Sequence, residues 1–174
     1  MSQIKVNSIV PTSGLPSGAS GGIIQMKQTV RTSVFSESVG QGNESSVVLP
    51  VTITPQSANN KILVYVTAMM ALNTTHGRTF SLKRGSTSIC LGDAADSRSR
   101  RTGGTSSTNS SAPSVITMMF LDSPNTTSTL TYGITLSHNE NGTLTTYLNR
   151  TDSDTNGSHV SRHASTLTVM EVST

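Results

Sequence analysis

The chain has little of several residue types on which large classes of protein depend. Of its 174 residues none is Trp, aromatic residues make up 3 % and charged residues only 12 %, against about 25 % charged in average soluble proteins. A groove for single-stranded nucleic acid needs aromatic rings among its basic side chains, and the arginine cluster at residues 98–101 contains none. Although the net charge is +3, we therefore expect no nucleic-acid partner.

Cysteine and long apolar runs are also scarce. The one cysteine, Cys90, excludes an internal disulfide framework, and its short apolar run at residues 88–91 indicates a small buried thiol. No apolar run approaches the roughly 20 residues that cross a bilayer, so we expect no membrane insertion. The opening residues lack the continuous apolar stretch of a secretion signal, so we expect no export by that route.

Ser and Thr make up about a third of the chain, and the apolar residues gather in short runs between polar turns. Thr and Val both suit the pleated surface of a sheet, and alternation with period two indicates strands. The pattern predicts nine strands and no helix. The expected strands cover residues 23–30, 46–54, 61–72, 79–83, 88–91, 115–121, 130–136, 144–148 and 166–172.

The connections complete the prediction of fold class. Residues 139–142 (NENG) lie between two alternating runs, and Asn-Gly favours a hairpin. Residues 92–114 form a long polar loop, which is typical of a functional or mobile segment. Many short strands joined by polar turns predict an all-β fold, an antiparallel β-sandwich of jelly-roll type, over residues 23–174.

The first 22 residues read as an extended N-terminal arm. A short alternating segment passes into a stretch rich in Pro and Gly, which indicates a strand followed by a tether. Such an arm can dock to another protein by adding a strand or packing along a groove. The expected docking residues are Ile4, Val6, Ile9, Val10, Leu15 and Ile23.

Two expected strands, KILVYVTAMMAL and VITMMFL, are apolar on both faces. A sandwich covers only one face of each sheet, so the second face needs another cover. Another subunit is the simplest source, and we expect a homo-oligomer.

Residues 152–157 (DSDTNG) reproduce the first half of a calcium loop, with oxygen ligands at positions 1, 3 and 5 and a Gly at position 6. The bidentate Glu expected at position 12 falls on His163. We therefore predict no metal and no cofactor. If an ion is bound, its ligands come from Asp152, Asp154, Asn156, His159 and His163.

No pattern in the chain specifies catalysis. Residues 18–22 match G-x-S-x-G but lack the strand, helix and downstream partners of a nucleophile elbow. The alternative of a polysaccharide depolymerase requires a carboxylate pair in a groove. The nearest acidic residues are Asp93, Asp96, Asp152 and Asp154, which lie in loops without aromatic platforms. The absence of a recognisable site argues against an enzyme.

Several segments resemble virion structural proteins of tailed phages, especially the tail-fibre-like proteins of marine cyanobacterial phages. They are IKVNSIVPTSGLPSGASGGIIQ, ITPQSANNKILV, FSLKRGSTSICLGDAADSRSR, FLDSPNTTSTLTYGITL and YLNRTDSDTNGSHVSRHASTLTVMEV. The resemblance implies a non-enzymatic, trimeric tail fibre or appendage, which is assembled in the bacterial cytoplasm. Its arm would dock to a tail adaptor or the capsid. A head fibre or capsid decoration protein is the alternative.

In such a protein the distal loops would contact the host surface, where hydroxyl and amide side chains suit polysaccharide. The expected contact loops are residues 92–114 and 151–163. Their candidate binding residues are Asp93, Asp96, Arg98, Arg100, Arg101, Asp152, Asp154 and Asn156.

Overall fold

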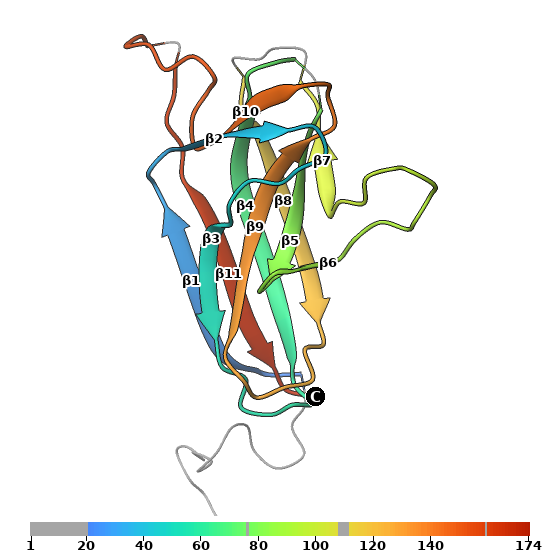
Figure 1. Cartoon of the computed structure of the whole chain (residues 1–174). Helices are drawn as coiled ribbons and strands as arrows, with labels where there is room; N and C mark the ends of the chain where they lie inside the picture. Colours follow the sequence, from blue (N-terminus) through green and yellow to red (C-terminus); the bar gives the residue numbers. More distant parts are fainter. Residues whose placement is uncertain (1–20, 76, 108–111, 159) are drawn as a thin grey trace, which may run out of the picture.

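The structure is a computed structural model that describes residues 21–75, 77–107, 112–158 and 160–174. In these residues the chain is an all-β sandwich of two antiparallel sheets (Figure 1), which confirms the predicted fold class. The strands are β1 (Ile23–Arg31), β2 (Phe35–Gly40), β3 (Val48–Ile53), β4 (Lys61–Leu72), β5 (Arg78–Arg84), β6 (Thr87–Ile89), β7 (Gly103–Thr105), β8 (Ser114–Asp122), β9 (Leu130–His138), β10 (Thr143–Leu148) and β11 (Ser165–Val172).

We call the six-stranded sheet sheet A and the five-stranded sheet sheet B. Sheet A has the strand order β1-β11-β4-β10-β2, and β8 pairs with β4. Sheet B has the order β3-β9-β5-β6, and β7 pairs with β5. Strand β4 is the longest and joins three neighbours, β8, β11 and β10.

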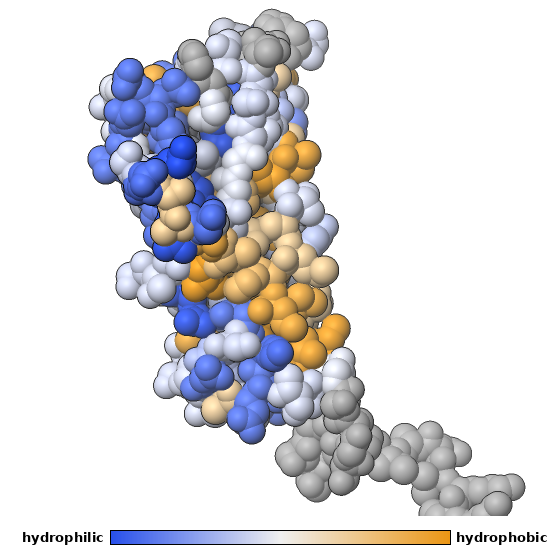
Figure 2. Space-filling model, turned by 90° about the vertical axis from the view of Figure 1, so that its right-hand side faces the viewer, coloured by the Kyte–Doolittle hydropathy of each residue, from blue (hydrophilic) through white to orange (hydrophobic). Residues whose placement is uncertain are grey.

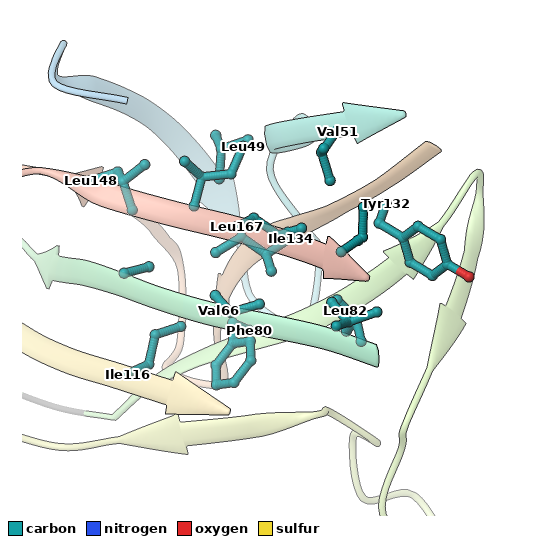
Figure 3. Packing of buried hydrophobic residues seen from close by; sticks show 14 of the residues in the cluster. Leu49, Val51, Val66, Phe80, Leu82, Ile116, Tyr132, Ile134, Leu148 and Leu167 are labelled. Carbon is teal, nitrogen blue, oxygen red and sulfur yellow. The ribbon is translucent and has the colours of Figure 1, made fainter. Parts of the chain in front are cut away.

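The core lies between the two sheets and follows from alternation along the strands. On β4 the even-numbered Ile62, Val64 and Val66 are fully buried, while the odd-numbered Tyr65 is 39 % exposed. Figure 3 shows β4 and β11 of sheet A and β9 and β5 of sheet B directing Val66, Leu167, Ile134 and Leu82 into one cluster. Burial of such side chains stabilises the fold by roughly 1.5–3 kcal/mol each.

All nine expected strands are present, but the structure contains two that sequence reasoning missed. Strand β2 has the sequence FSESVG, in which Phe35 and Val39 alternate with polar residues. Strand β7 lies inside the long polar loop and consists of Gly103, Gly104 and Thr105. A Cβ on Gly103 would stand 2.7 Å from the Phe80 ring, so glycine allows β7 to approach β5.

The hairpin predicted at residues 139–142 is wrong. Strand β9 belongs to sheet B and β10 to sheet A, and each pairs with other strands. The segment instead carries the chain from one sheet to the other. Gly142 still adopts the left-handed conformation (φ 84°) that an Asn-Gly turn provides.

The described chain starts and finishes at the same end of the sandwich, which we call the entry end. The backbone N–H of Gly21 donates to the Ser173 carbonyl (2.9 Å), and that of Ser173 donates to the Gly22 carbonyl (2.9 Å). Ile23 opens β1 opposite Val172 and is 57 % exposed. The other expected docking residues, Ile4, Val6, Ile9, Val10 and Leu15, lie outside the described residues.

Candidate functional site

Polar connections gather at the end of the sandwich opposite the entry end, which we call the loop end (Figure 1). The β2–β3 turn, the β9–β10 connection and residues 151–163 lie there, because β2, β9 and β10 all have one terminus at this end. These segments line two hollows of about 500 Å³ and 300 Å³, the larger one together with the 92–102 loop.

The larger hollow lies between the tip of the 92–102 loop and two turns of the sandwich. All but one of its lining residues have polar side chains, which supply amides, hydroxyls and one guanidinium group. The lining residues are Gln41, Gly42, Ser97, Arg98, Ser99 and Asn139. These groups both donate and accept hydrogen bonds, so the hollow suits a ligand rich in hydroxyl groups.

Glu44 fastens the 92–102 loop to the outer face of sheet B. Its carboxylate binds the Lys83 ammonium (2.5 Å), the Ser81 hydroxyl (2.6 Å) and the Arg101 guanidinium (3.4 Å). Burial alone would raise the pKa of Glu44, but the hydrogen bonds from Lys83 and Ser81 and the two nearby cations leave it below its ordinary value. Glu44 therefore stays ionised and holds the base of the loop at neutral pH.

The loop also holds itself together. The Gly92 N–H donates to the Arg101 carbonyl (3.2 Å), and Arg100 Nε donates to the Gly92 carbonyl (2.8 Å). Asp96 has a positive φ of 47° at the turn. Arg101 further donates to the Gly42 carbonyl (2.6 Å). Arg100 and Arg101, which we predicted as surface-binding residues, thus both make contacts that shape the loop.

The remaining charged residues of this loop are presented to solvent. The side chains of Arg98 and Asp96 are 76 % and 93 % exposed and form a loose ion pair (3.7 Å), which contributes little to stability. Asp93 is exposed as well. Of these three, Arg98 lines the larger hollow and is the one best placed to meet a ligand.

The smaller hollow lies within residues 151–163. Asp154 accepts from Arg162 (2.6 Å) and lies 3.5 Å from Arg150. The Arg150 guanidinium in turn covers the Tyr147 ring at 4.7 Å from its centroid, an arrangement typical of a cation–π contact. Asn156 and Arg162 line the hollow beside Asp154. The charged groups that line this hollow are therefore paired with one another, and its hydroxyl and amide groups could bind a ligand.

The calcium-type half loop has its second carboxylate engaged by these two arginines, and Asp152 accepts from the backbone N–H of Ser153 (2.6 Å). The His163 ring lies 3.1 Å from the Ser161 hydroxyl, and His159 lies outside the described residues. Within the described part of the chain, no group of three His, Cys, Asp or Glu side chains is placed to hold a metal ion.

The acidic residues considered for a depolymerase do not form one cluster. Figure 1 shows the 92–102 loop and the 151–163 segment leaving the sandwich on opposite sides. Asp93 and Asp96 therefore do not lie beside Asp152 and Asp154.

Sequence reasoning missed the residues that organise the larger hollow. Gln41, Glu44 and Asn139 come from two separate connections, and Lys83 lies on β5. No local pattern joins them, because sheet register rather than chain proximity brings them together.

Loosening of the loop is expected when its anchor is removed. Arg101→Ala should lower the free energy of unfolding by about 1 kcal/mol, because the bonds to Glu44 and Gly42 are lost. It should also make trypsin cleavage at Arg98 and Arg100 several-fold faster, as followed by mass spectrometry. Arg98→Ala is the matched control for stability and should change it by less than about 0.5 kcal/mol. Unchanged cleavage in the Arg101 variant would show that Glu44 does not anchor the loop.

Comparison with known proteins gives no further assignment. Among the residues that the structure describes, no helix is long and apolar enough to span a membrane. None of the protein-family models matches the chain, and a search of curated proteins finds no relative. The candidate site is therefore defined by this chain's own residues.

Proposed function

We propose that this protein is a non-enzymatic structural protein of a phage virion, a tail fibre or tail appendage whose loop end contacts the host surface. The proposal is based on the difference between the two ends of the sandwich. Gly21 and Ser173 are paired at the entry end, whereas both hollows are lined by residues of connections that lie at the opposite end (Figure 1).

This difference supports separate roles for the two ends, attachment to the particle at the entry end and contact with the host at the loop end. Gly21, the first described residue, lies at the entry end, so a partner bound at that end stays clear of the loop end. The arm at residues 1–22 is proposed to dock to a tail adaptor or to the capsid. The loop end then projects away from the particle.

The chemistry of the loop end supports polysaccharide as the ligand. Around Arg98 the larger hollow offers the amides of Gln41 and Asn139 and the hydroxyls of two serines, which match the hydroxyl groups of a sugar. Neither hollow is lined by an aromatic ring, so a sugar gains hydrogen bonds here without stacking. Such a site is weak on its own and needs several copies for firm attachment.

The test combines location with binding. Cryo-electron microscopy of intact particles is expected to show this chain at the tail, with its entry end against another virion protein. Density spread over the capsid would instead identify a head fibre or decoration protein. Absence of the chain from purified particles would refute the virion role altogether.

Binding is tested with purified protein and host surface polysaccharide. Arg98→Ala is expected to weaken binding about tenfold, because a hydrogen bond from a charged group contributes roughly 1.5–3 kcal/mol. Thr127→Ala, at an exposed position in the β8–β9 connection, is the matched control and should bind like the wild type. An equal loss of affinity in both variants would show that the loop end does not bind the polysaccharide. Shortening of the polysaccharide chains during incubation would instead indicate a depolymerase.

A further inference from the structure

The outer face of sheet A carries an uncharged apolar surface. On it β8 turns Val115, Met119 and Leu121 outward, and these lie opposite Met69, Tyr65 and Leu63 of β4. Met119 is 68 % exposed, Val115 57 % and Leu121 45 %. Figure 2 views the molecule from the right-hand side of Figure 1, where β8 forms the edge of sheet A, and shows hydrophobic residues gathered along that side.

The apolar surface continues from β4 across β11 and β1. Strand register places Met170 of β11 beside Leu63, and Met26 of β1 beside Met170. Met26 is 59 % exposed. The positions between these rows hold Thr and Gln side chains, for example Thr67 and Gln28. In the rows from Leu63 to Met69 no charged residue lies on this face, and Lys61 lies one row beyond them, at the start of β4.

Sheet B differs on its own outer face. That face carries Ser81 and Lys83, which bind Glu44, and Arg101 at the base of the 92–102 loop binds the same carboxylate. Thr135 and Ser137 of β9 lie on this face and are buried. In the described residues no comparable segment covers sheet A, as the exposure of Met119 and Met26 shows. One face of the sandwich is therefore polar and covered by its own chain, and the other is apolar and open.

Strand β8 adds a second open feature. Among the described strands it pairs only with β4, so its other edge forms no strand pairing, and β7 comes near only the part of β8 with which it lines a hollow. A long apolar edge strand is a template for association unless it is blunted or covered. Its outward positions from Val115 to Leu121 hold no charge that would blunt it.

We propose that the outer face of sheet A, together with the β8 edge, is the surface through which copies of this chain associate. An uncharged apolar face is complementary to another copy of itself, whereas a charged partner would lose hydration there without gaining an ion pair. Four strands spaced about 4.8 Å apart, each with about nine residues at 3.3 Å, give a footprint of roughly 570 Å². That approaches the roughly 800 Å² of accessible surface that each partner buries in a standard interface.

The association does not depend on the proposed virion role, but it serves that role. The face runs along the strands, so copies joined through it in a ring lie side by side. A cyclic arrangement such as the trimer then presents several loop ends in the same direction, which supplies the multiple contacts that weak polysaccharide sites need.

The experiment measures the mass of the full chain in solution by sedimentation velocity and light scattering from roughly 1 to 100 µM. The wild type is expected at a multiple of its 18.2 kDa chain mass. Met119→Glu should raise the dissociation constant on the order of a hundredfold or more, because it places an unpaired carboxylate in the interface. Thr87→Glu adds the same charge at an exposed position on β6 of sheet B and should leave the mass unchanged.

Two further variants keep the result decisive. Met26→Glu places the charge on β1, away from the β8 edge. It tests the same face if circular dichroism shows that Met119→Glu is misfolded. Deletion of residues 2–20 should leave the oligomer intact. A monomeric wild type at about 100 µM, an oligomer that survives both charge variants, or one that dissociates only on deletion of the arm would each overturn the proposal.

Discussion

Asp122→Ala is expected to lower the free energy of unfolding by about 3 kcal/mol, the largest effect of any single substitution proposed for this protein. Asp122 ends β8 and is 6 % exposed. Its two oxygens accept from Arg84 Nη1 (2.9 and 2.8 Å), and one of them also accepts from the Tyr132 hydroxyl (2.6 Å). Alanine would leave a guanidinium and a buried hydroxyl without their acceptor, and removing one partner of a buried pair costs more than the pair itself contributes.

Urea denaturation followed by circular dichroism measures the effect. Burial, and then the Asp122 carboxylate beside it, raises the pKa of Tyr132, so its hydroxyl remains a donor at neutral pH. Tyr132→Phe should therefore cost only about 1 kcal/mol, the value of one hydrogen bond. Asp93→Ala, which removes a carboxylate from an exposed loop, is the matched control. A loss below about 1 kcal/mol for Asp122→Ala would mean that Arg84 finds another partner or solvent.

Glu171→Ala should have the next largest effect, a loss of about 2–3 kcal/mol, because it would leave three donors without an acceptor. Glu171 lies on β11 near the entry end and is 0 % exposed. Its carboxylate accepts from the side chains of Gln25 (2.6 Å) and Asn60 (2.7 Å) and from the backbone N–H of Gln56 (2.7 Å). These bonds join β1, β11 and the β3–β4 connection.

The same carboxylate makes stability depend on pH. Burial alone would raise the pKa of Glu171, but hydrogen bonds from Asn60, Gln25 and backbone N–H groups leave it below the ordinary 4.5. The unfolded chain therefore binds the proton at a higher pH than the folded chain. The stabilisation is fully present above about pH 4.5 and is lost as the pH falls through the folded pKa.

Thermal unfolding of Glu171→Gln from neutral to acid pH tests this dependence. The variant should start less stable than the wild type and lose less on acidification. Glu44, whose pKa is also lowered, should leave a residual acid slope in the variant. Glu140→Gln, in the β9–β10 connection, is the control and should follow the wild-type profile. Parallel profiles for wild type and Glu171→Gln would show that Glu171 does not contribute to the acid response.

Apolar runs and alternation along the chain were sufficient to predict the strands but not their partners. Residues 61–72 were predicted as one strand from a near-continuous apolar run, without alternation, and form β4 with the same bounds. The Asn-Gly turn at Gly142 is also a local signal, yet the flanking strands belong to different sheets. Sheet membership depends on packing across the core, which no short segment encodes. Strand β7 escaped because glycines carry no side chain to alternate.

In the candidate site, too, local features were predictable from the sequence and pairings between distant residues were not. Its loops were found from their polar composition, and Arg98, one of the predicted contact residues, lines the larger hollow. The roles of Arg100 and Arg101 were not evident, since Arg101 is held by Glu44, 57 residues earlier in the chain. That pairing exists only after β5 and the β2–β3 turn have met. Charge and exposure can be predicted from a loop sequence, whereas the counter-ion of each charge depends on register.

The pairing of β1 with β11 also constrains how the protein is made. In the described sheet β1 pairs only with β11, so Ile23 cannot form its pairing until Val172 has been synthesised. During translation β1 therefore remains without its partner until β11 has left the ribosome, and sheet A is completed only after synthesis of the whole domain. Folds dominated by such distant contacts form in milliseconds to seconds. Until that pairing forms, Met26 and its neighbours are exposed to other nascent chains, so chaperone binding should favour the soluble product over aggregates.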